Sequence, residues 1–235
     1  MMERRDFIKM CAASCALGAH EALAAKDLSP RFYARAHLVN ERGQPIKAAS
    51  LVATENYIFH YPFEGTPCFL LNLGKPTVRD VSLKTEDGSL YQWPGGVGPR
   101  RAIVAYSAIC AHRMTYPTPQ ITFISYREKS TAGAAMRRNV IHCCSEHSEY
   151  DPASGARVVG GPAPQPLAAV LLEHDAKDDG LYAVGTLGAE MHNTFFEKFA
   201  FKLALDYGAD KVRRPVAQRS VVQPLQEFCK QQVRC

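Results

Sequence analysis

The stretch from His142 to Pro164, HCCSEHSEYDPASGARVVGGPAP, contains most of the chemistry that this sequence displays. Its first part includes Cys144-Ser145-Glu146-His147, and Ser148 and Tyr150 follow at once. A second pair of similar composition, Cys110-Ala111-His112, lies upstream at the end of an apolar run. Two short segments, each with one thiol and one imidazole, predict a metal centre enclosed between two loops.

These two pairs match the ligand demand of a Rieske centre, in which two thiolates bind one iron and two imidazoles bind the other. We therefore predict Cys110, His112, Cys144 and His147 as ligands of a [2Fe–2S] cluster. Cys143 competes with Cys144, but only Cys144 stands three residues before His147, so Cys143 is predicted to be free or buried. A zinc site of two cysteines and two histidines is the alternative that this composition leaves open.

The segment from Ile109 to about Glu173 resembles the cluster-binding region of Rieske proteins, in particular the iron–sulfur subunit of cytochrome bc complexes. Gly161, Pro162, Ala163 and Pro164 match the Gly-Pro-Ala-Pro loop that covers the cluster in that family. The resemblance implies an all-β fold, a Rieske-type antiparallel β sandwich with a cluster-binding subdomain at about 108–166. It also implies that the hydroxyls of Ser148 and Tyr150 donate hydrogen bonds to sulfurs of the cluster site.

The chain also departs from the family pattern. The extra cysteines that form a disulfide between the two loops of bc-type subunits would fall at Thr115 and Glu146, and both are absent. The second loop looks one residue shorter, because the family has a glycine between the histidine and Ser-x-Tyr. Residues 113–139 form a long insertion, which is either a partner contact or an idle surface loop. These features indicate a divergent member.

The rest of the chain reads as many short strands followed by a helical end. Apolar runs at 32–39, 57–61, 68–73, 78–83, 101–108, 121–126, 139–142, 167–172 and 181–184 alternate with Gly, Pro and Asp turns, which is typical of a β sandwich or barrel. The spacing of aromatic and leucine residues predicts a helix from His192 to Tyr207, ended by Gly208. We divide the chain into a Rieske domain at 25–190 and a C-terminal helix and basic tail at 191–235.

The N-terminus resembles a twin-arginine export signal. Arg4-Arg5 precedes Phe7 and a short apolar stretch, and Ala22-Leu23-Ala24 gives a cleavage pattern before Ala25. Residues 1–24 are therefore predicted to be a signal that is cleaved or, as a second choice, retained as an anchor to the inner membrane. The expected location is periplasmic, and export of already folded protein suits a chain that receives a metal cofactor first.

Composition narrows the partners. The formal net charge of the 235 residues is +5, without a concentrated basic patch bearing aromatic residues, so no nucleic-acid role is expected. The eight cysteines do not form a dense disulfide pattern, because two lie in the N-terminal segment and Cys143 and Cys144 are neighbours.

These observations predict an exported electron-transfer protein, an oxidoreductase subunit rather than a stand-alone enzyme. It would pass single electrons from a donor such as a quinol to a cytochrome c-type acceptor. The alternatives are the small Rieske subunit of a periplasmic molybdoenzyme resembling arsenite oxidase, and a ferredoxin component of an oxygenase. No His/His/carboxylate iron triad is apparent, which argues against an oxygenase domain itself.

Overall fold

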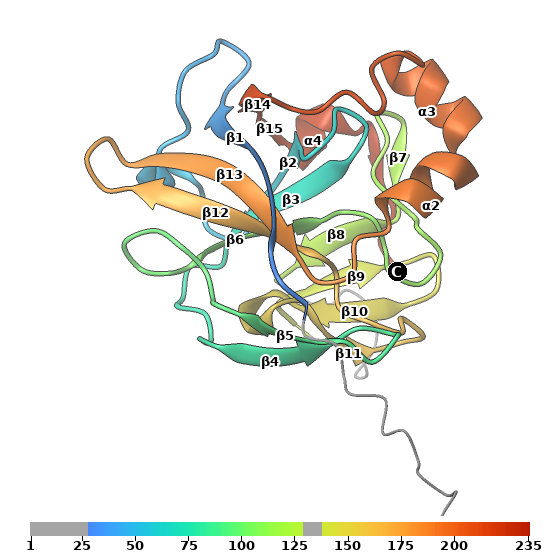
Figure 1. Ribbon diagram of the computed structural model, residues 1–235, viewed down its shortest axis with the longest axis horizontal. Coiled ribbons are helices and arrows are strands. Elements are labelled where there is room, and N and C mark those ends of the chain that lie inside the picture. Colours follow the sequence, from blue (N-terminus) through green and yellow to red (C-terminus); the bar gives the residue numbers. More distant parts are fainter. Residues whose placement is uncertain (1–27, 129–137) are drawn as a thin grey trace, which may run out of the picture.

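The computed structural model describes residues 28–128 and 138–235, and the predicted signal at 1–24 lies outside these ranges. The described chain is mostly β, and its short α-helices lie in the C-terminal part (Figure 1). This confirms the predicted all-β class with C-terminal helices.

The largest sheet is antiparallel except at β14, which pairs in parallel with β1. Its strands, in spatial order, are β14 (Gln218–Val221), β1 (Arg31–Val39), β13 (Gly180–Leu187), β12 (Ala169–Asp175), β6 (Ile103–Ser107), β3 (Pro67–Asn72), β2 (Asn56–His60) and β15 (Gln223–Pro224).

A smaller, four-stranded antiparallel sheet carries the second cysteine segment. Its strands, in spatial order, are β11 (Arg157–Gly160), β10 (Ser148–Asp151), β9 (Val140–Cys143) and β8 (Ile124–Arg127). Two further pairs are β4 (Val81–Lys84) with β5 (Leu90–Trp93), and β7 (Ile121–Thr122) with β16 (Gln231–Gln232).

Strands β3 and β6 of the large sheet have buried side chains on both of their faces. On one face, Phe69 and Tyr106 belong to the core shared with the smaller sheet, and the Tyr106 hydroxyl donates to the Pro152 carbonyl at 2.8 Å. On the other face, Leu70 and Ala105 belong to a second core. Strand β6 ends at Ser107, and Cys110, three residues later, belongs to the core between the two sheets.

The C-terminal region differs from the single predicted helix. Helix α2 (His192–Lys198) and helix α3 (Ala200–Tyr207) are separated at Phe199, whose φ of −112° is not helical. Phe195, Phe196 and Leu203, from both helices, join one buried cluster with Tyr116. The bend therefore lets apolar residues of both helices pack in one cluster.

The predicted strand at 121–126 is also divided. The Thr122 hydroxyl accepts from the Ile124 amide at 3.2 Å and donates to the Ile124 carbonyl at 2.8 Å. Such local bonds compete with the ladder of a sheet. As a result, β7 pairs with β16 of the tail, whereas β8 pairs with β9.

The tail at 191–235 is built into the molecule. Strands β14 and β15 extend the large sheet, and helix α4 (Leu225–Phe228) follows them. The C-terminus lies beside β9 (Figure 1). In the described ranges we find no helix with the length and apolar content that crossing a bilayer requires.

Candidate metal centre

The first cysteine segment forms a tight loop after β6. The Cys110 amide donates to the Thr115 carbonyl at 2.8 Å, and the Met114 amide donates to the Cys110 carbonyl at the same distance. Met114 adopts a φ of +62°, which closes the turn. Cys110 is only 2% exposed, so the loop presents its thiol to the core and not to solvent.

The second segment is the hairpin between β9 and β10, in which Cys143 pairs with Ser148. Side chains alternate between the two faces of a strand. Ile141 and Cys143 therefore point into the core between the sheets, whereas His142 and Cys144 belong to the opposite face. This alternation decides which of the two neighbouring cysteines can meet the first loop.

The structure brings Cys110 and Cys143 together. Their thiols are hydrogen-bonded, and this contact lowers the pKa of Cys110 and raises the pKa of Cys143. The Tyr150 hydroxyl lies 3.2 Å from Cys110 Sγ and accepts from the Ala111 amide at 3.1 Å. With the amide already donating to its oxygen, the hydroxyl has its own hydrogen to offer to sulfur. Burial raises the pKa of Tyr150, which keeps that hydrogen in place.

Two buried polar atoms at these loops have no hydrogen-bond partner among the described residues. They are His112 Nδ1 and Ser148 Oγ. Buried polar groups are almost always satisfied, so such atoms call for an explanation. A metal cluster between the loops fits both, because Nδ1 can ligate a metal ion and the serine hydroxyl can donate to a sulfide.

Cys144, which the sequence predicted as the second thiolate, lies on the opposite face of the strand from this pair. It forms a disulfide with Cys235, with Cα atoms 5.7 Å apart. Its Sγ also accepts from the Arg127 guanidinium at 2.8 Å. The prediction rested on the three-residue spacing to His147, whereas the structure sets Cys143 beside Cys110.

His147 is likewise placed away from the thiol pair. Its exposed ring lies 5.7 Å from the ring of His142, centroid to centroid, and the two imidazoles form a group with Cys235. Burial, together with Arg127 and His147, lowers the pKa of His142 to about 4. His147 has a φ of +57°, a conformation that glycine adopts readily.

Glu146, in the second loop, also contacts the first loop. Its carboxylate forms an ion pair with Arg113, Nε to Oε1 2.9 Å, and Arg113 directly follows His112. Cys143 is a free, buried cysteine, as predicted. The sequence analysis did not single out Glu146. A signal that includes it is the spacing Cys143-x-x-Glu146, with one residue between Glu146 and Ser148-x-Tyr150.

The Gly161–Pro164 loop packs directly on the second cysteine loop. A Cβ built on Gly161 would overlap the His147 carbonyl and lie 2.6 Å from Ser148 Cα. Ala163 packs against the core that contains the two thiols. The structure thus places this loop over the hairpin, where the resemblance expected a cover.

Replacing Gly161 with alanine is expected to lower the free energy of unfolding by about 3 kcal/mol. The energetic cost of a positive φ adds to the cost of the overlap between the new Cβ and the backbone. Gly43→Ala is the matched control, since Gly43 also has a positive φ, +74°, but a Cβ there meets nothing nearer than 3.7 Å. The control is expected to lose about 1 kcal/mol. Urea unfolding of both variants measures the difference, and equal losses would show that the loop does not pack as described.

The insertion at 113–139 contributes β7, β8 and Arg127 to this region, and residues 129–137 lie outside the described ranges. Its described part connects the hairpin to the C-terminal strand β16. It is therefore partly a structural support for the tail, a use that neither of the two predicted roles included.

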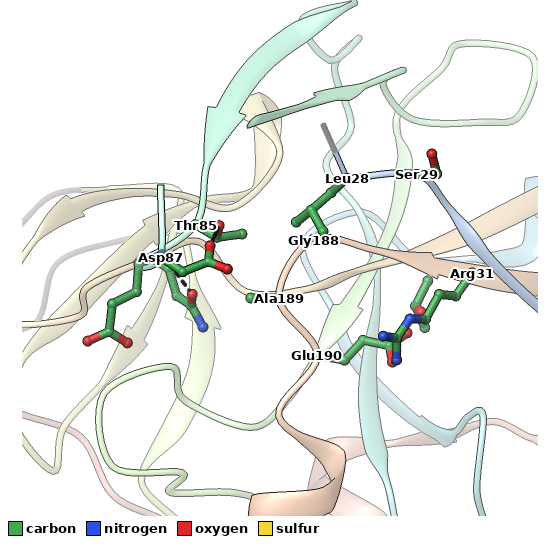
Figure 2. Close-up of a pocket in the computed structure, with 11 residues that line it drawn as sticks. Leu28, Ser29, Arg31, Thr85, Asp87, Gly188, Ala189 and Glu190 are labelled. Carbon is green, nitrogen blue, oxygen red and sulfur yellow. Dashed lines mark hydrogen bonds and ion pairs between the residues drawn. The ribbon is translucent and has the colours of Figure 1, made fainter. Parts of the chain in front are cut away.

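A separate cavity of about 440 Å³ lies near the start of β1. Figure 2 shows Arg31 and Glu190 beside each other on one side of it and Asp87 on another. Arg31 donates to Glu190 at 3.0 Å, while burial raises the pKa of Glu190. None of the cysteines, histidines or hydroxyl residues predicted for the cluster site lines this cavity.

No protein-family model matches the chain. Among solved structures, the chain is similar to the soluble domain of Rieske protein II (soxF) from Sulfolobus acidocaldarius. The identity is 29%, the similarity covers 66% of this chain and 78% of that chain, and the TM-score is 0.43.

Proposed function

We propose that this protein is a single-electron carrier that binds a [2Fe–2S] cluster between the loops at 110–115 and 143–148. The observation that carries the proposal is the convergence of Cys110, Cys143 and Tyr150 beside the unpartnered His112 Nδ1 and Ser148 Oγ. The cysteines would hold one iron, as in a Rieske centre, and His112 would bind the other. When bound, the cluster accepts and releases one electron.

We assign the fourth ligand position to Glu146. With Cys143 as the thiolate, the Cys-x-x-ligand spacing ends at Glu146 and not at His147. The positive φ of His147 then falls where the resembling family has glycine, so the loop is not short but carries two replacements. A carboxylate oxygen is a hard ligand that suits ferric iron. Its ion pair with Arg113 holds it against the first loop.

A carboxylate in place of an imidazole adds negative charge to the site, and net charge is one of the factors that set the potential of such clusters. We therefore expect a potential below the upper end of the Rieske range. This favours a relay role, as in the small subunit of a periplasmic molybdoenzyme, over quinol oxidation. The partners remain redox proteins such as a cytochrome c or oxidoreductase subunits, and export by the twin-arginine route remains part of the proposal.

A redox titration separates these roles. A value near about +300 mV would support quinol oxidation with transfer to a cytochrome c, and one near about −150 mV would support a ferredoxin-like relay. The second is the expected result. The presence of the cluster is tested on the protein purified without oxygen, by iron and acid-labile sulfide analysis with EPR of the reduced form. Two irons and two sulfides per chain are expected, and a colourless protein with stoichiometric zinc would refute the proposal.

Replacing Tyr150 with phenylalanine is expected to lower the reduction potential while the cluster stays bound. The hydroxyl on Cys110 Sγ stabilises the reduced, more negative cluster more than the oxidised one. A difference of about 1.4 kcal/mol, within the range of a hydrogen bond to a charged group, corresponds to about 59 mV. The same titration measures it, with Tyr126→Phe, in strand β8 of the same sheet, as the control. An unchanged potential would place the hydroxyl away from the cluster.

A further inference from the structure

A second group of metal-binding side chains lies on the opposite face of β9 from the proposed cluster. Ligand atoms of His142, His147 and Cys235 all lie within 4.8 Å of one another. Cys235 Sγ is 3.8 Å from each ring nitrogen of His142, and it is bonded to Cys144. Two imidazoles and two sulfurs therefore lie close together, and the two sulfurs are bonded to each other.

The C-terminal tail is held at this point by contacts besides the disulfide. Strand β16 pairs in parallel with β7, and the Val233 amide donates to the Thr122 carbonyl at 2.9 Å. The Arg127 guanidinium donates to the Val233 carbonyl at 2.7 Å and to the Cys235 carbonyl at 3.1 Å. Because these bonds do not involve sulfur, breaking the disulfide leaves Cys235 beside the two histidines.

We propose that reduction of the Cys144–Cys235 disulfide opens a zinc site formed by His142, His147, Cys144 and Cys235. Two thiolates and two neutral imidazoles form a closed tetrahedral set that Zn²⁺ prefers in structural sites. The Arg127 guanidinium donates to Cys144 Sγ at 2.8 Å, so this sulfur already lies beside a group that holds it next to the tail. The site would replace the covalent connection between tail and hairpin by a metal connection.

The chemistry balances with a dithiol reductant. The two sulfurs of the disulfide gain two electrons and two protons, and the dithiol loses the same and becomes a cyclic disulfide. Zinc then binds, and the two new thiols release their protons to solvent. The inference does not depend on the iron–sulfur cluster, since Cys110, Cys143, His112 and Glu146 take no part in it.

The test compares zinc uptake by the oxidised and reduced full-length protein. Each form is incubated with ZnSO₄ and desalted, the reduced form after treatment with a phosphine that does not compete for zinc, and zinc and iron are counted by mass spectrometry. We expect about one zinc per chain after reduction, at least a tenfold excess over the oxidised form, with the iron content unchanged. Equal uptake by both forms would overturn the proposal, as would uptake that matches a loss of iron.

Single substitutions test which side chains bind the zinc. His147→Gln, at an exposed position, and Cys235→Ser are each expected to lose the reduction-dependent zinc. His174→Gln is the matched control, because His174 is a histidine of the large sheet that bonds to Asp179 away from this face. Cys143→Ser is expected to retain the uptake, which separates this site from the cluster. Zinc uptake that survives in both His147→Gln and Cys235→Ser would show that the disulfide serves only as a covalent connection.

Discussion

Replacing Cys143 with serine is expected to abolish the iron–sulfur cluster, whereas replacing Cys144 with serine is expected to leave it in place. Cys143 is 1% exposed, belongs to the core between the two sheets and is hydrogen-bonded to Cys110. Cys144 lies on the other face of the strand and is bonded to Cys235. A serine hydroxyl is a poor substitute for a thiolate on iron, because it stays protonated at neutral pH and lacks the negative charge with which cysteine holds such clusters.

Iron and sulfide content of the two variants measures this difference directly. The expected result is less than a tenth of the wild-type iron in Cys143→Ser and wild-type iron in Cys144→Ser. Each variant replaces the sulfur of one of two neighbouring cysteines by oxygen, so each is the control for the other. Loss of the cluster in Cys144→Ser alone would restore the assignment based on spacing to His147.

Removing the disulfide by Cys235→Ser is expected to lower the free energy of unfolding by about 4 to 5 kcal/mol in the chain-entropy treatment of cross-links. The two cysteines are 91 residues apart in sequence, so the bond closes a long loop of the unfolded chain. The contacts of β16 and Arg127 stay in the folded variant, and the loss therefore comes mainly from the unfolded state.

Urea unfolding measures this loss, with wild-type protein in reductant and without zinc as the reference. The reduced wild type and the variant are expected to unfold at the same, lower urea concentration. Cys229→Ser is the control, because Cys229 is a free cysteine in the described structure and its removal breaks no cross-link. If Cys235→Ser unfolds with the oxidised wild type, the disulfide contributes nothing and the tail is held by its other bonds.

The sequence was sufficient for the fold class and for most of the strands, because short apolar runs between turn residues report local structure. In the first loop the choice of cysteine is unambiguous in the sequence, since Cys110 follows the strand at 101–108 and has no competing cysteine nearby. The orientation of the cysteines in the hairpin between β9 and β10 is harder to predict. Two adjacent cysteines point to opposite faces of a strand, and which face meets the core depends on the register of β9 with β8 and β10.

The role of the C-terminus could not be read from local patterns. Cys235 reaches Cys144 because β14 and β15 join the large sheet and β16 pairs with β7, and such pairings join residues far apart in sequence. The contact of His142 with Cys235 depends on the same long-range pairings. Only the three-dimensional structure separates the buried pair of Cys110 and Cys143 from the cysteines of the disulfide.

The proposed cluster lies between the two loops, with one imidazole ligand, His112, and one carboxylate ligand, Glu146. The most direct test is pulsed EPR of the reduced protein grown with ¹⁵N-histidine. One strongly coupled histidine nitrogen is expected, absent in His112→Gln and retained in His147→Gln. Two coupled nitrogens, one of them lost in His147→Gln, would contradict the account and assign the fourth position to His147.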